Sequence, residues 1–352
     1  MTNSLFNQPT ILNRGDAEWT QTRHQLHKKL SNFCQLNNLN CTFILSEDLI
    51  QTSPNQKIVF IQITDLIPSL DVWQTYNQQC QQSGKQISVI TDNIVPWQDL
   101  TCIKFFSYPQ LMALTFVFDD VLPDHNTPVK LYNCLVQRTE SVRLSWFYFL
   151  HHLNLLDQGL VSYQFKSQTN YSDTLIGKDL LDFIHNKYEL YNLPHFHDAY
   201  LNLRDQIPYK NFEEPPDQWD ESLLLLQSKY SIVLESYAAD DVTDDYAWCF
   251  TEKTLRKIQF PNIPLLFVQK NGIHQLQQLG LEFGDHLNLL DRLDWQQRQQ
   301  EILKIVVNNS IDYNYKDLYN QSLHNRDVLL QWKKQYQKEN FFDNFYDWTR
   351  TF

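Results

Sequence analysis

The sequence predicts an α/β protein built from two domains, and three observations lead to this fold class. The chain has 352 residues, about the length of two ordinary domains. Short apolar segments at 57–63 and 86–90 have the length of buried strands, and a helical segment lies between them. A second strand–helix–strand pattern runs from Tyr230 to Val268. Strands that alternate with helices in this way form parallel sheets.

The first predicted domain covers residues 1–125. Asp16 is a suitable N-cap for its first helix, and Gly84 is a residue type that commonly ends a helix. Two of its strands end in polar pairs, Thr64-Asp65 and Thr91-Asp92. The expected elements, in order, are a helix at about 17–36, strands at 42–45 and 57–63, a helix at about 70–83, and strands at 86–90 and 103–106.

The second predicted domain covers residues 126–352 and follows a linker at 124–128. Gly159 is expected to separate a helix from the next strand, and Asp294 to cap a later helix. Its expected elements are a strand at 130–136, a helix that carries Arg143 and runs to about residue 156, strands at 160–163, 230–234, 263–268 and 280–283, and helices at 295–307 and 316–338.

Composition excludes several functional classes. A net charge of −12 argues against a nucleic-acid partner, because phosphate backbones are bound by an excess of Lys and Arg. Only 7 glycines are present and neither GxGxxG nor GxxxxGK[ST] occurs, so a glycine-rich phosphate loop is not expected. No apolar run approaches the roughly 18 residues of a membrane span. The start of the chain is unlike a signal peptide and the six cysteines are dispersed, so we expect a cytoplasmic protein with reduced thiols.

The segment from Tyr230 to Val268 carries the clearest functional signal. Its first apolar run ends in Glu235-Ser236, and Thr251-Glu252-Lys253 then opens a basic helix. Ligands of open α/β sheets bind at such positions, beyond the carboxyl ends of the strands. An anion there would meet the first N–H groups of the helix and the ammonium group of Lys253, while Glu252 could accept hydrogen bonds from a ribose. The segment is therefore typical of a site for a nucleotide diphosphate.

The order of these residues resembles the donor-binding half of the α-1,3-fucosyltransferases. Those enzymes have a Glu-Asn-Ser turn, a Thr-Glu-Lys helix start and a Pro-Val strand; here the Asn is missing between Glu235 and Ser236, and Leu265 follows Pro264. The resemblance implies a GT-B type architecture, with two Rossmann-like domains facing a cleft and a C-terminal helix that crosses back. It also implies that Arg138 and Arg143 face the phosphates of the donor.

Transfer of a sugar with inversion needs a general base, which in this architecture comes from the first domain. Asp65 and Asp92 follow predicted strands there and are our candidates; Glu47 and Asp48 are equally possible. Each of these residues also suits an ordinary turn or helix cap.

Two further groups of residues suggest metal sites at first sight. The loop at 240–245 contains four aspartates, and His195, His197 and Asp198 lie close together in sequence. Mutual repulsion favours a solvated acidic loop, and the histidine group has no third His or Cys nearby. We therefore expect neither a metal nor a cofactor, because Lys and Arg already neutralise the diphosphate of a nucleotide-sugar substrate.

The sequence thus predicts a glycosyltransferase that moves a sugar from a nucleotide-sugar, similar to GDP-fucose, to a glycan or another hydroxyl acceptor. Donor-site residues are Arg138, Arg143, Glu235, Thr251, Glu252 and Lys253. Two alternatives remain open: a non-catalytic nucleotide-binding or scaffold protein of the same fold, and an enzyme of other phosphate-ester chemistry. Thr251-Glu252-Lys253 would, in the simplest structural interpretation, be an ordinary helix start.

Overall fold

The fold is described from a computed structural model, and the chain divides into two compact units. Unit 1 comprises residues 1–117, 242–252 and 328–352, and unit 2 comprises residues 118–241 and 253–327. The boundary predicted near residue 125 lies outside the described residues. The structure describes residues 35, 58–63, 70–84, 86–91, 93–97, 100–107, 128–136, 141–163, 209–212, 221–235 and 247–337.

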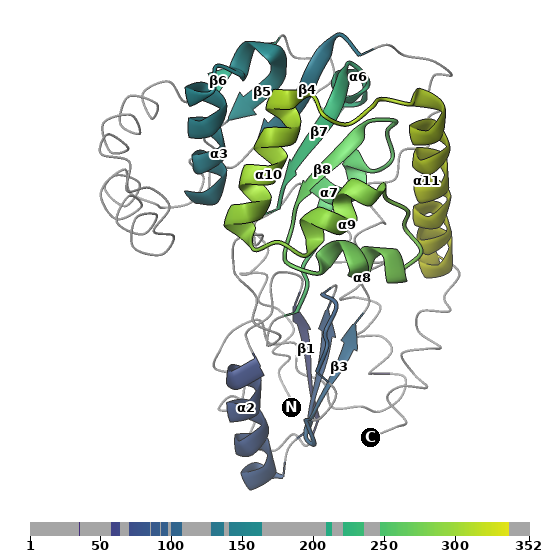
Figure 1. Cartoon of the computed structure of the whole chain (residues 1–352). Coiled ribbons are helices and arrows are strands. Elements are labelled where there is room, and N and C mark those ends of the chain that lie inside the picture. The colour runs from purple at the N-terminus through teal and green to yellow at the C-terminus, as the bar shows by residue number, and fades with distance from the viewer. Residues whose placement is uncertain are drawn as a thin grey trace, which may run out of the picture. The chain divides into compact units, whose positions relative to one another are not determined.

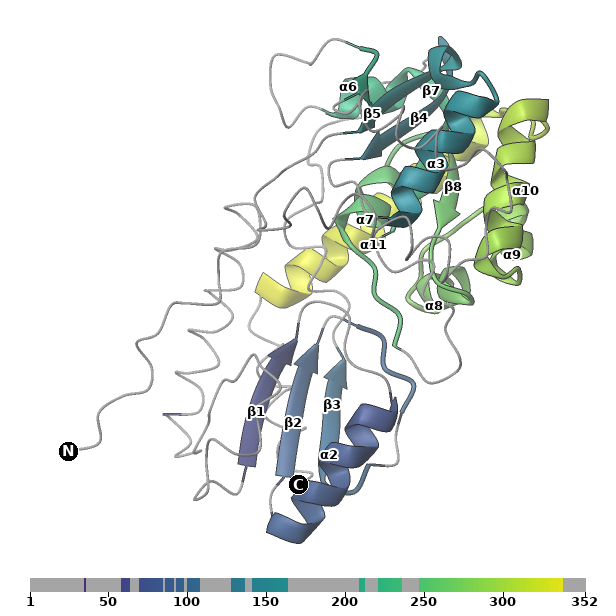
Figure 2. The same ribbon diagram turned by 90° about the vertical axis from the view of Figure 1, so that its left-hand side faces the viewer.

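Unit 1 contains a three-stranded sheet, as the alternation of strands and helix predicts. The strands lie in the order β1-β2-β3 and all pair in parallel. Figure 2 shows helix α2 along this sheet. The element bounds are β1 (Ile58–Ile63), α2 (Leu70–Ser83), β2 (Gln86–Thr91) and β3 (Ile103–Ser107).

Apolar packing holds α2 against this sheet. Trp73 of α2 is buried with Ile87, Val89 and Ile103, and its ring meets Phe105 edge to face with centroids 5.1 Å apart. The helix ends at the predicted residue because Gly84 adopts φ +65°, a left-handed conformation that glycine reaches without strain.

Unit 2 contains a five-stranded mixed sheet in the order β6-β5-β4-β7-β8. The four longer strands are parallel to one another, and the short edge strand β6 pairs antiparallel with β5. The fold class predicted from the sequence, α/β, is therefore confirmed. The strands are β4 (Lys130–Val136), β5 (Gly159–Tyr163), β6 (Tyr209–Lys210), β7 (Ser228–Leu234) and β8 (Ile263–Phe267).

Helices cover both faces of the five-stranded sheet, as buried parallel strands require. On one face, Trp146 and Phe147 of α3 (Ser141–His152) contact the rings of Phe267 and Tyr163. On the other face, Tyr319 of α11 (Tyr315–Gln337) packs on a cluster that includes Leu135. Figures 1 and 2 show α3 and α11 on opposite sides of the sheet.

Gly159 begins β5, and its lack of a side chain has a specific reason. It lies opposite Tyr132 in the β4–β5 pairing, and a Cβ atom built on it would be 2.4 Å from Cζ of that ring. The Tyr132 hydroxyl donates to the carbonyl of Leu155, which holds the ring over the glycine. Gly159 is therefore a packing position in a strand. The helix predicted to run to about residue 156 ends earlier, at His152, and Asn154 then adopts a left-handed φ of 53°.

The C-terminal half of the chain adds helices, of which three were predicted: α7, α10 and α11. The side chain of Asp294 accepts a hydrogen bond from Gln297 N at 2.7 Å and caps α10, as predicted. The predicted C-terminal helix corresponds to α11. The remaining elements are a 3₁₀ turn (Leu156–Gln158), α6 (Glu221–Leu226), α7 (Glu252–Lys257), α8 (Gly272–Gln278), α9 (Asp285–Asp291) and α10 (Trp295–Asn308).

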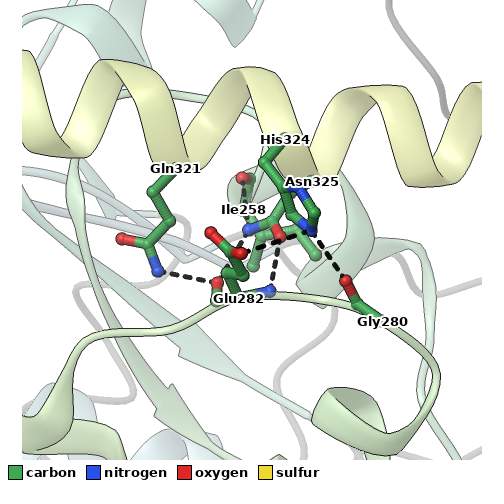
Figure 3. Close-up of polar contacts among 6 residues, drawn as sticks. All are labelled: Ile258, Gly280, Glu282, Gln321, His324 and Asn325. Carbon is green, nitrogen blue, oxygen red and sulfur yellow. Dashed lines mark hydrogen bonds and ion pairs between the residues drawn. The ribbon is translucent and has the colours of Figure 1, made fainter.

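One predicted strand is wrong. Residues 280–283 do not join the sheet, because side chains of α11 bind the polar backbone groups that a neighbouring strand would otherwise pair. Asn325 accepts from Glu282 N at 2.7 Å and donates to Glu282 O at 3.0 Å (Figure 3). Gln321 donates to the same carbonyl oxygen, and His324 lies 2.9 Å from Gly280 O. An apolar run such as Leu281-Glu282-Phe283 cannot distinguish these two ways of satisfying a backbone.

Several predictions concern residues outside the described part. These are the helix at 17–36, where only Gln35 is described and is helical, and the strand at 42–45. Within the described residues, no helix is both long and apolar enough to cross a membrane.

Candidate functional site

The candidate site lies where the strand order of the five-stranded sheet reverses. From β4 the chain moves outward to β5, and it then returns to β7 on the other side of β4. The segments that leave the carboxyl ends of β4 and β7 therefore diverge, which is the usual position of a ligand in an open α/β sheet. The two sequence segments predicted to bind the donor follow these two strands.

Arg143 connects the two sides of this point. It belongs to α3, which follows β4, yet its Nε donates to the backbone carbonyl of Leu234 at the end of β7, at 3.2 Å. The side chain is only 2% exposed. A buried guanidinium at the predicted place supports a cationic site, although one of its donors already binds the protein backbone.

Glu235 follows the last residue of β7 and is also 2% exposed. Its backbone N–H donates to Phe267 O of β8, which extends the strand pairing by one residue. Its Oε1 accepts from Thr254 Oγ1 at 2.6 Å and from Thr254 N at 3.2 Å. Glu235 thus fastens the first turn of α7 to the end of β7, and the Thr254 N–H that the sequence assigned to an anion binds this carboxylate instead.

Lys253 is the second residue of α7 and is half-buried. Thr251, directly before the helix, is half-buried as well, and Glu252 is the first helical residue. The predicted helix start is therefore present. Thr254 and Lys253 are neighbours in the chain, so the contact that fixes Thr254 also fixes the backbone that carries the Lys253 ammonium group.

A second lysine of α7, which the sequence did not identify, is buried against the middle of β4. Lys257, at the end of α7, is 5% exposed, and its Nζ donates to Asn133 Oδ1 of β4 at 3.3 Å. Ser231 of β7 donates to the same oxygen at 3.0 Å, and Asn133 Nδ2 donates to the Tyr230 carbonyl. The positive charge of Lys257 is thus held between β4 and β7. A basic residue at the end of an amphipathic helix is normally solvated, so the sequence carried no signal of this burial.

Arg143 and Lys257 affect the pKa of the buried thiol of Cys134. Burial raises the pKa of Cys134 to about 11, while a hydrogen bond from Tyr163 and the charges of Lys257 and Arg143 lower it by a smaller amount. Cys134 Sγ lies 3.6 Å from the Tyr163 hydroxyl. Cys134 is therefore a neutral thiol at pH 7, which agrees with the reduced core cysteine that the sequence predicts.

The next helix along the sheet is held in a similar manner. Asp291 of α9 accepts from Ile273 N and His274 N in the first turn of α8, at 2.9 and 3.0 Å. Burial raises the pKa of Asp291, and these two hydrogen bonds and the charge of Arg298 oppose the rise. The helices that follow β7 and β8 are therefore both anchored by an internal carboxylate.

Other predicted residues are not placed by the structure. Arg138, Asp65, Asp92, the acidic loop at 240–245 and the group around His195 lie outside the described residues. Where the chain is described, no cluster of three or more His, Cys, Asp or Glu side chains could hold a metal ion. Both the donor contact of Arg138 and the choice of general base remain predictions.

Comparison of the chain with protein-family models, with curated proteins and with solved structures gave no match. The similarity to fucosyltransferases therefore stays a prediction from the sequence.

Proposed function

We propose that the protein is a glycosyltransferase that binds a nucleotide-sugar at the switch point between β4 and β7. The observation that supports this best is the presence of buried Arg143 and Glu235 at the carboxyl end of β7, with half-buried Lys253 in the first turn of the helix that Glu235 holds. Burying charged groups is costly, and such groups in a core are more frequent at functional sites than elsewhere.

The cations have a clear use in this chemistry. When the sugar leaves, negative charge grows on the diphosphate, and fixed positive groups nearby stabilise that charge. Lys253 and Arg143, with Arg138 as predicted from the sequence, would contact the phosphates; Glu252 would accept hydrogen bonds from the ribose. Lys257, at the other end of the same short helix, adds a buried positive charge against Asn133 of β4.

The remainder of the proposal follows from the sequence. The molecule would have the GT-B arrangement of two Rossmann-like domains, with a metal-independent donor site in residues 126–352. The acceptor, a glycan or another hydroxyl compound, would bind to residues 1–125, where Asp65 or Asp92 would take the proton of the acceptor.

A thermal-shift panel with GDP, UDP, CMP and their sugars tests the donor site. A ligand at 100 times its dissociation constant stabilises a protein by about 2.7 kcal/mol, a shift that is easily measured. Lys253→Ala should weaken binding about 10- to 100-fold, the cost of one charge-assisted hydrogen bond. Lys304→Ala is the matched control, because Lys304 lies on α10 with its side chain 64% exposed and pairs with Glu301 at 3.1 Å on the same helix.

If no nucleotide stabilises the wild-type protein, the donor-site proposal is wrong. If a nucleotide does stabilise the protein, turnover separates an enzyme from a scaffold that only binds. The enzyme should slowly hydrolyse one nucleotide-sugar in the absence of an acceptor, whereas a scaffold would bind it and release no free sugar.

A further inference from the structure

We infer that Glu235 is a positioning residue that directs Lys253 through Thr254 and does not itself contact the nucleotide. This inference rests on the proposed function and changes the part that the sequence assigned to Glu235. The sequence placed Glu235 among the residues that contact the donor. In the structure, its carboxylate would act on the donor only through the helix that carries Lys253.

The first argument is the way in which Glu235 is held. Its main chain pairs with Phe267 of β8, and its carboxylate oxygen Oε1 receives two hydrogen bonds from Thr254. With 2% of its surface exposed, Glu235 has little area to offer a ligand. The carboxylate therefore acts as a fixed connection between the sheet and α7.

The second argument is the shortness of α7. This helix has 6 residues, and helices much shorter than about 12 residues do not hold their own shape in water. Its orientation must come from tertiary contacts. Thr254 is fully buried and uses both its N–H and its hydroxyl on a single oxygen, which sets the position and the rotation of the first turn.

The consequence concerns Lys253. Rotation of the first turn determines the direction in which the side chain of Lys253 leaves the helix. Without the Glu235–Thr254 contact, the ammonium group would lose its fixed direction toward a phosphate. Glu252 precedes Lys253 in the same turn, so a ribose contact made by Glu252 would also weaken. Disruption of the Glu235–Thr254 contact should thus weaken diphosphate binding more than nucleoside binding, because the contact of an ammonium group with a phosphate is stronger than a hydrogen bond to a neutral hydroxyl.

The test compares dissociation constants for GDP and guanosine, and for UDP and uridine, by isothermal titration calorimetry. Thr254→Val should weaken diphosphate binding about tenfold, the loss of roughly one hydrogen bond. Glu235→Gln keeps an oxygen that accepts from Thr254 but removes its charge, so its effect should be smaller. Both should weaken nucleoside binding less than diphosphate binding. Thr254→Ser, which keeps the hydroxyl, should retain diphosphate binding, and the Glu235→Gln/Thr254→Val double variant should be no worse than Thr254→Val alone.

Asp291→Asn is the matched control. It alters the corresponding carboxylate, which holds the first turn of α8 through Ile273 N and His274 N, on a helix that does not carry Lys253. It should lower the unfolding temperature and leave the ratio of diphosphate to nucleoside affinity unchanged. Unfolding temperatures measured without ligand show which variants fold; if Glu235→Gln does not, the Thr254→Val and Thr254→Ser pair decides the question.

Three results would overturn the inference. A loss of nucleoside binding in Glu235→Gln that Thr254→Val does not reproduce would mean that Glu235 contacts the ribose directly. Additive losses in the double variant would mean that Glu235 does not act through Thr254. A wild-type protein that binds none of the four probes would overturn the proposed function itself, and with it this role of Glu235; wild-type data alone distinguish that result from the other two.

Discussion

The two sheets differ in the polar groups that their parallel strands bury among the described residues. In unit 1, Thr91 Oγ1 accepts from both nitrogens of Asn93, and the Ser107 hydroxyl donates to Asn93 O; all of these groups are neutral. In unit 2, Arg143 and Glu235 are buried at the carboxyl end of β7, and Lys257 is buried against the middle of β4.

This difference has a physical meaning. A neutral, hydrogen-bonded turn after a strand costs little free energy. Buried charges lose their hydration, so they are stable only when they have specific partners. Among the described residues, the end of β7 is therefore the better candidate for a ligand site.

The largest expected effect is a difference in the local free energy of opening between two single variants, Asn133→Ala in unit 2 and Asn93→Ala in unit 1. Loss of Asn133 removes an acceptor from Lys257 and from Ser231 and a donor from Tyr230 O, so the local free energy of opening should fall by about 2–3 kcal/mol. Loss of Asn93 removes neutral contacts and should cost about 1 kcal/mol. Amide hydrogen exchange measured separately for β4 and β2 reports both values. Equal costs would remove the contrast between the two sheets.

A smaller effect is expected from Gly159→Ala, which tests unit 2 away from its charged end. The new methyl group would clash with the Tyr132 ring, and overpacking of this kind costs about 1–3 kcal/mol. Nucleotide affinity should not change, because Tyr132 and Gly159 pair at the opposite, amino-terminal part of β5.

Gly84→Ala is the comparison for this variant in unit 1. No atom lies within 4 Å of its new Cβ, so only the φ of +65° opposes it, at a cost of about 1–2 kcal/mol. In a Tyr132→Leu background the cost of Gly159→Ala should shrink, while that of Gly84→Ala should stay the same. Thermal unfolding of these variants in both backgrounds measures this, and an undiminished cost of Gly159→Ala would show that the ring is not its cause.

The smallest effect concerns His286, another ionisable side chain of unit 2. Burial lowers its pKa below the ordinary 6.5, and its Nε2 lies 3.0 Å from Pro264 O, to which the neutral ring can donate. The unfolded chain therefore binds a proton more readily than the folded one. The free energy of unfolding should fall as the pH drops below 6.5 toward the lowered pKa of the folded state.

His286→Gln keeps a donor for Pro264 O and removes the titration. The fall in unfolding temperature between about pH 7 and pH 5 should thus be smaller in this variant than in the wild type. His324→Gln, which changes a more exposed imidazole on α11, is the control for removing a histidine. A wild-type and a His286→Gln profile with the same slope would contradict the assignment.

Local signals predicted the elements well. The helix at Leu70–Ser83 and its end at Gly84, and the helix that begins after Asp294, depend on caps and apolar periodicity within a few residues. The parallel pairing also followed, because strands joined through helices have little alternative. The prediction of a strand at 280–283 was wrong for the complementary reason. The backbone groups of this segment bind side chains of α11, about 40 positions away, and no local pattern indicates such partners.

Some residues of the candidate site could be identified from the sequence and others could not. The sequence identified Arg143, Glu235 and Lys253, because they are polar residues close to the ends of predicted strands or at the start of a predicted helix. Lys257 could not be found, since its partner Asn133 is 124 positions away and Ser231, which shares that partner, is 98 positions from it. The part played by Glu235 also depends on a contact across 19 positions with Thr254.

The sequence by itself determined the α/β class, the order of most strands and helices along the chain, and the residue types at the charged end of β7. Only the tertiary structure decided that β4 and β7 are neighbours, that Lys257 is buried and that Glu235 binds the first turn of α7. Periodicity and capping act over one or two turns of chain, whereas burial and hydrogen-bond partners depend on which distant segments the packing of the sheet brings together.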